Sequence, residues 1–150
     1  MIAEVDGNAR QAHVLVMSSV GRWLPLIAAC IGVWIVSSMS HPPVPAVFSF
    51  ANADKLLHCA GYSVLGALAF YGMRGRGWPR EALIAWVFVV LFGFSDEYHQ
   101  SFVPGRDASL GDVAADAVGG AIGVGALAWW FSLRSKRQSA KTESEKPKPG

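Results

Sequence analysis

The segment from Ser95 to Asp116, SDEYHQSFVPGRDASLGDVAAD, joins two long apolar runs of the chain. Its acidic residues and Arg106 fall between those runs or just inside their ends. Ionisable side chains at membrane depth are energetically costly, which makes them candidates for function. If the apolar runs cross a membrane, these polar residues collect on one side of it.

The composition of the chain indicates a small membrane protein. Of its 150 residues, 52% are hydrophobic and 16% are charged. This is too apolar for an ordinary soluble domain, and the length allows only one domain. Cys30 and Cys59 lie in apolar stretches and are predicted to be packing thiols rather than a disulfide. No nucleic-acid partner is expected.

Four apolar runs are long enough for membrane-spanning helices, which need about 17–25 residues. They cover residues 23–39, 56–73, 82–98 and 113–133, the third only if Asp96 and Glu97 are included. The connections between them are short, and the first contains three prolines, which suit a loop. We therefore predict an all-α integral membrane four-helix bundle.

The basic residues predict the orientation of this bundle. Of 13 Lys and Arg residues, only Lys55 and Arg106 fall in the first and third connections. By the positive-inside rule, both termini are predicted to be cytoplasmic. Residues 1–22 are then a cytoplasmic leader, and the polar residues 134–150 are predicted to be a disordered cytoplasmic tail. Contact of the tail lysines with anionic lipid is the alternative to a solvated tail.

Three of the predicted helices carry paired polar residues at their outer ends. The pairs are Asp54 and His58, Asp96 and Gln100, and Asp112 and Asp116, with Tyr62 one turn beyond His58. Residues four positions apart share one face of a helix. Asp54 and Asp112 could also stabilise helix N-termini. Asp96 lies at a C-terminal helix end and Asp116 lies a turn inside the membrane, so each needs a partner, a cation or a proton.

Arg106 is the only guanidinium on the predicted outer side, and the turn Pro104-Gly105-Arg106 would aim it. Two interpretations of this arginine stay open. It could join the carboxylates in an internal ion-pair network that fixes the bundle. It could instead bind an anion, a phosphate or a carboxylate, in bidentate fashion.

The histidines raise the question of a metal or a reaction. His58 and His99 stand near acids that could hold a divalent cation. Because no motif such as HExxH is present, no metal or other cofactor is predicted, and a divalent cation is the alternative. No nucleophile elbow surrounds the nearby serines. His58 and Asp96 are the candidates for acid–base catalysis.

The last apolar run contains several glycines, among them the pair Gly119-x-x-x-Gly123. This spacing allows two helices to approach closely. Packing within one chain is expected, and a dimer seam is the alternative.

Three polar motifs follow one another along the chain. They are Asp54-Lys55-x-x-His58-x-x-x-Tyr62, then Asp96-Glu97-x-x-Gln100-x-Phe102-Val103-Pro104-Gly105-Arg106, then Ser109-x-x-Asp112 before the glycine-rich run. In this order, over residues 23–133, they resemble the VanZ-like family. These are small bacterial membrane proteins named for an accessory protein that raises resistance to the antibiotic teicoplanin.

The resemblance implies a multi-pass protein of the bacterial inner membrane with a role in the cell envelope, and it implies no reaction. The family usually has asparagine where this chain has Asp116. A carboxylate at that depth must be neutralised or paired.

Residues and resemblance together predict an outward-facing site that binds or acts on an envelope lipid or a lipid-linked cell-wall intermediate. A link to glycopeptide resistance is a further expectation, and membrane lipids are the other predicted partners. A membrane hydrolase or transferase and a structural bundle without a ligand are the alternatives. The predicted ligand-binding residues are Asp54, His58, Tyr62, Asp96, Glu97, Gln100, Arg106, Asp112 and Asp116.

Overall fold

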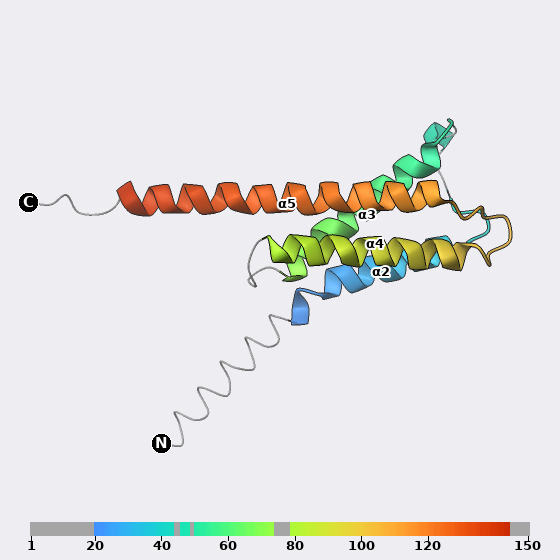
Figure 1. Cartoon of the computed structure of the whole chain (residues 1–150), viewed down its shortest axis with the longest axis horizontal. Helices are drawn as coiled ribbons and strands as arrows, with labels where there is room; N and C mark the ends of the chain where they lie inside the picture. Colours follow the sequence, from blue (N-terminus) through green and yellow to red (C-terminus); the bar gives the residue numbers. More distant parts are fainter. Residues whose placement is uncertain (1–19, 44–45, 49, 74–78, 145–150) are drawn as a thin grey trace, which may run out of the picture.

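The computed structural model describes residues 20–43, 46–48, 50–73 and 79–144. They form helices α2 (Leu24–Ser37), α3 (Ala53–Met73), α4 (Arg80–Gln100) and α5 (Leu110–Ser144), with a short 3-10 helix, η1 (Ala46–Phe48). Within these ranges there is no strand, which confirms the all-α prediction. Figure 1 shows α4 running alongside α5, while α3 crosses them at an angle.

Helices α3, α4 and α5 are long and apolar enough to cross a membrane. The predicted spans 56–73, 82–98 and 113–133 lie within them. Their outward faces carry exposed apolar side chains such as Val64, Leu91 and Ile122. Lipid tails would cover such a surface, because a bilayer is as apolar as these side chains.

Helix α2 is shorter than the span predicted at residues 23–39. It has 14 residues and a proline in its first turn. At 1.5 Å per residue it is about 21 Å long, less than the roughly 30 Å of a bilayer's hydrocarbon core. Among the described residues four α-helices therefore form, as predicted, but only three of these have the length of a membrane span. One face of α2, with Ile27, Ile31 and Ile35, is exposed.

Helix α5 is longer than predicted and corrects the expected disordered tail. It continues from the apolar span through residues 134–144 and ends at Ser144. These residues include Lys, Arg, Gln, Ala and Glu, which favour helices, and the first proline beyond them is Pro147. The polar composition indicated disorder, but intrinsic helix propensity and a helix already nucleated in the span favour continuation. The rest of the predicted tail, residues 145–150, lies outside the described residues.

Helices α3 and α5 approach each other at glycines, which we call the glycine crossing. Gly119 packs against the carbonyl group of Cys59, and Gly123 packs against that of Ser63. A Cβ atom at either glycine would overlap backbone atoms of α3, so a larger residue needs the helices to separate. This confirms that the Gly119-x-x-x-Gly123 pair packs within one chain.

The ends of the helices place the polar residues. The start of α3, the end of α4 and the start of α5 lie at one end of the bundle, on the right in Figure 1, beside the end of α2. The buried apolar core, with Leu65, Ala85 and Val89, lies away from that end. The paired polar residues predicted to share one depth are therefore brought together.

Candidate functional site

The polar end holds a group of side chains that we call the polar cluster. Its members come from α3, α4 and α5, and they are Lys55, His58, Asp96, Glu97, Gln100, Asp112 and Asp116. The four carboxylates are almost completely buried, with relative exposures of 1% for Asp96, 5% for Glu97, 5% for Asp112 and 0% for Asp116. Buried charges are costly unless they are paired, so their partners decide what the cluster can do.

Lys55 links the starts of α3 and α5. Its Nζ lies 3.0 Å from Asp54 Oδ2 and 3.2 Å from Asp112 Oδ1. Asp112 lies in the first turn of α5, as predicted, and the lysine compensates its buried charge. Asp54 is exposed, and an exposed ion pair contributes little to stability.

His58, in the second turn of α3, contacts Asp116, in the second turn of α5. His58 Nδ1 lies 3.0 Å from Asp116 Oδ1 and 4.0 Å from Glu97 Oε1. Asp116 has room because residue 93 of α4 is glycine: a Cβ there would lie 2.8 Å from Asp116 Oδ2. The predicted partner of Asp116 is thus a histidine on the neighbouring helix.

The end of α4 is tied to α2 and to the loop before α5. The Gln100 amide lies 3.0 Å from Asp96 Oδ2, 3.3 Å from Glu97 Oε1 and 3.3 Å from Ser37 Oγ. The backbone N–H of Ser109 donates to Glu97 Oε2 at 2.8 Å. Glu97 therefore fixes the loop before α5, and Gln100 links the end of α4 to α2 and donates to Asp96.

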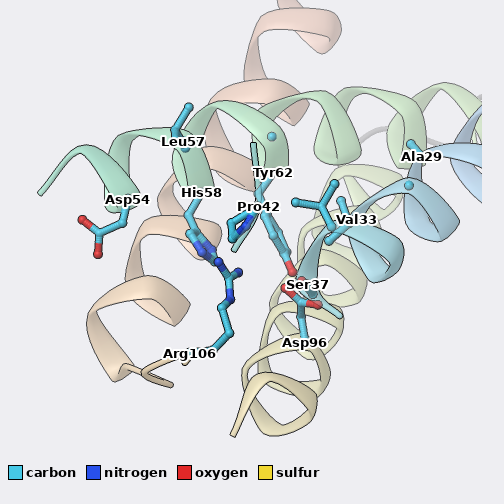
Figure 2. A pocket seen from close by; sticks show the side chains of 13 residues that line it. Ala29, Val33, Ser37, Pro42, Asp54, Leu57, His58, Tyr62, Asp96 and Arg106 are labelled. Atoms are coloured by element: carbon cyan, nitrogen blue, oxygen red, sulfur yellow. The ribbon is translucent and has the colours of Figure 1, made fainter. Parts of the chain in front are cut away.

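Several buried polar atoms have no hydrogen-bond partner among the described residues. They are the Tyr62 hydroxyl, Asp96 Oδ1, Asp116 Oδ2 and Arg106 Nε. Figure 2 shows the Tyr62 phenol pointing toward Asp96. Orphaned buried groups of this kind are rare in folded proteins and call for an unseen partner. The cluster is therefore incomplete as a purely structural network.

A pocket of about 400 Å³ opens beside the cluster. Some predicted site residues line it, namely Asp54, His58, Tyr62, Asp96 and Arg106, and Figure 2 shows them together. The other predicted residues, Glu97, Gln100, Asp112 and Asp116, are not part of the lining and support it from behind. The remaining lining is mostly apolar and comes from α2, α3 and the first connection.

Arg106 reaches the pocket from the loop between α4 and α5. The preceding Gly105 has a φ of +81°, which favours glycine and turns the chain there. Arg106 and His58 both line the pocket, and both are labelled in Figure 2. Among the described residues it forms no ion pair, so the internal Arg106–carboxylate network is not seen. The guanidinium is available to an anion in the pocket.

The second histidine does not join the site. His99 stacks on Trp34 of α2 with ring centroids 4.2 Å apart, and its Nε2 lies 2.9 Å from Ser38 Oγ. His99 is therefore not part of the group of potential metal ligands found among the described residues. The residues that could hold a metal ion are His58, Glu97 and Asp116, whose ligand atoms lie within 4.8 Å of one another.

The sequence interpretation missed two members of the site. Lys55 lies in the first turn of α3, and it pairs with Asp112 in the first turn of α5. Because both helices were predicted to start on the same side, this ion pair could have been suggested from the sequence. Ser37 lies at the end of an apolar run without a charge, and nothing in the sequence indicated its contact with Gln100. The apolar wall from α2 was also missed, because it depends on how α2 packs on α3.

The sequence profile described as VanZ/LLP1 matches residues 14–132, which confirms the resemblance seen in the motifs. No curated protein and no solved structure matches. Because the match covers most of the chain and contains both the polar cluster and the pocket, the protein belongs to the VanZ/LLP1 family.

Proposed function

We propose that this protein binds an anionic amphiphile of the bacterial cell envelope, a lipid or a lipid-linked cell-wall intermediate, in the pocket. One observation carries the proposal. Arg106 lines the pocket and forms no ion pair among the described residues. A guanidinium that is not used by the fold suits a phosphate or carboxylate group, which it can bind through two parallel hydrogen bonds.

The lining of the pocket supports an amphiphile rather than a free anion. Ala29, Gly32, Val33 and Val36 contribute one wall along a single side of α2, and Leu57 and Gly61 of α3 extend the apolar lining. The polar residues gather at the other end, around Arg106. Such a pocket accepts an apolar chain along the helices and a polar headgroup beneath the arginine.

Two orphaned groups in the pocket suit hydroxyl groups of a sugar or glycerol. The Tyr62 hydroxyl and Asp96 Oδ1 are buried without partners and belong to residues that line the pocket. A ligand hydroxyl can donate to the carboxylate and accept from the phenol. The desolvation of both groups would then be compensated on binding.

We further propose that the site faces outward from the inner membrane. Among the described residues, Arg22, Arg80 and the basic residues at the end of α5 lie at the opposite end of the helices from Arg106. The positive-inside rule would place these residues in the cytoplasm, together with both termini. The pocket would then meet lipids of the outer leaflet. A cell-wall ligand on that side is what would link the protein to glycopeptide resistance.

A second candidate function is hydrolysis or group transfer on the same ligand. The observation that favours it is the 3.0 Å contact between His58 Nδ1 and Asp116 Oδ1. A carboxylate on one imidazole nitrogen orients the ring and leaves Nε2 free to move a proton. Since His58 lines the pocket, it is the residue that would act as general acid or base.

Native mass spectrometry of protein released directly from bacterial membranes tests the binding function. We expect the wild type to retain a specific lipid or lipid-linked sugar, and Arg106→Gln to lose it. Arg137→Gln is the matched control, because it removes the same charge from an exposed position at the far end of α5. If all three proteins carry the same bulk phospholipid or none, the structural alternative without a ligand is favoured.

Turnover separates the two candidate functions. Purified protein incubated with the retained lipid should leave it unchanged if the protein only binds. Conversion by the wild type, lost in His58→Asn while the lipid is still retained, would establish the catalytic alternative.

A further inference from the structure

We propose that His58, Glu97 and Asp116 bind a divalent transition-metal cation where α3, α4 and α5 meet. His58 Nδ1 lies 3.0 Å from Asp116 Oδ1 and 4.0 Å from Glu97 Oε1. One ion with nitrogen and oxygen ligands at about 2.0–2.2 Å holds those ligand atoms roughly 3–4 Å apart. All three ligand atoms lie within 4.8 Å of one another, so the side chains must draw closer together to share an ion.

The electrostatics of the cluster favour a cation at this position. Lys55 compensates Asp112, but Glu97 and Asp116 have only His58 as a cationic partner within 4.0 Å among the described residues. Asp116 is 0% exposed, and its Oδ2 has no partner within the described chain. A proton on Oδ2 would leave an O–H without an acceptor, whereas a cation would satisfy the carboxylate and compensate both acids.

The surrounding residues hold the three ligands in place. The Ser109 N–H donates to Glu97 Oε2 at 2.8 Å, and the Gln100 amide lies 3.3 Å from Glu97 Oε1. Gly93 leaves the space that Asp116 occupies. Hydrogen bonds that orient the ligands in this way are usual around metal ions in proteins.

The ligand set indicates the class of metal. Carboxylates alone suit Mg²⁺, Ca²⁺ or Mn²⁺, whereas an imidazole favours transition metals such as Zn²⁺ or Fe²⁺. Three protein ligands leave at least one coordination position open, as in catalytic zinc sites. The inference does not rest on the proposed function, because Glu97 and Asp116 do not line the pocket and the ion alone can be tested.

Calorimetric titration of ZnCl₂ into the full-length protein, purified in detergent without an affinity tag and treated with EDTA, tests the site. We expect one Zn²⁺ per chain in the wild type and binding at least tenfold weaker in Glu97→Gln. Asp107→Asn is the matched control, since it removes the same charge from an exposed position in the neighbouring loop, and it should bind like the wild type. No binding by the wild type, or equal weakening in both variants, would overturn the proposal.

X-ray absorption of the zinc-loaded wild type decides the question even if Glu97→Gln does not fold. The expected spectrum shows one imidazole nitrogen together with oxygen ligands at about 2.0–2.2 Å. A sulfur ligand, or more than one imidazole, would assign the zinc to other residues and overturn the proposal.

Discussion

Helices α3 and α5 meet twice within a few residues, once at the glycine crossing and once at the polar cluster. Cys59 of the crossing directly follows His58 of the cluster, and Gly119 lies one turn beyond Asp116. At the crossing, side chains are absent and backbone packs on backbone. At the cluster, charged side chains are buried and some of their atoms lack partners.

This difference indicates that the glycine crossing holds the two helices together, whereas the polar cluster does not serve packing alone. The crossing satisfies the packing of both helices without polar groups, so it contributes stability and sets the distance between them. That short distance allows Asp116, with its short side chain, to reach His58 at 3.0 Å. The cluster uses this geometry but leaves buried groups unsatisfied, which is how binding sites differ from structural packing.

The largest effect is expected from breaking the crossing. In Gly123→Ala the new Cβ overlaps the backbone at Ser63, which cannot move aside like a side chain. Because α3 and α5 must separate, we expect a loss of about 3 kcal/mol or more in unfolding free energy. Denaturation in mixed micelles with increasing SDS measures it.

Gly125→Ala is the matched control for that experiment. Residue 125 has no atom within 4 Å of an added Cβ, so the unfolding free energy of this variant should equal that of the wild type or exceed it by up to about 1 kcal/mol, because alanine favours a helix more than glycine. Equal stability of the two variants would show that the crossing does not set the packing of α3 on α5.

A smaller loss of stability is expected at the edge of the cluster. Lys55→Ala removes the cation that lies 3.2 Å from the buried Asp112, and it should lower the midpoint of thermal unfolding. Asp54→Asn changes the other, exposed partner of the same lysine and should leave that midpoint almost unchanged. A larger drop in the unfolding midpoint for Asp54→Asn than for Lys55→Ala would contradict the conclusion that the ion pair with Asp112 is the one that stabilises the protein.

The smallest change in stability should have the opposite sign and is expected at Asp96 of the polar cluster. Asp96→Asn removes a buried charge whose Oδ1 has no partner, and the amide oxygen can still accept from Gln100. We expect the unfolding free energy to rise by about 1 kcal/mol while lipid retention falls. Thermal unfolding and native mass spectrometry of the same sample give both values. A loss of stability would instead make Asp96 part of the scaffold.

The sequence predicted the helices wherever apolar composition decides their extent. The runs 56–73, 82–98 and 113–133 lie inside α3, α4 and α5 because about twenty apolar residues form a helix in a membrane. Prediction was less accurate at α2 and at the end of α5. There the helix limits depend on a proline, on capping and on helix propensity rather than on hydropathy.

For the site, the sequence predicted which residues lie together, but not which of them line the pocket and which pack behind it. Spacing by four residues placed Asp54 with His58 and Asp112 with Asp116 on common faces at one end. It could not show that Asp116 faces His58 from behind while Arg106 faces the pocket, because both depend on how the helices are rotated against each other. The contact between Ser37 of α2 and Gln100 could not be predicted either, because it joins residues far apart in the sequence.

The shortness of α2 has a consequence for the membrane around it. A helix of 14 residues cannot match a bilayer of ordinary thickness, and the mismatch costs a fraction of a kcal/mol for each Å. Lipids next to such a helix reduce this cost by thinning, which draws their headgroups toward the midplane. Because α2 forms one wall of the pocket, the membrane would be thinnest at its entrance, and a lipid entering there would move its headgroup a shorter distance to reach Arg106.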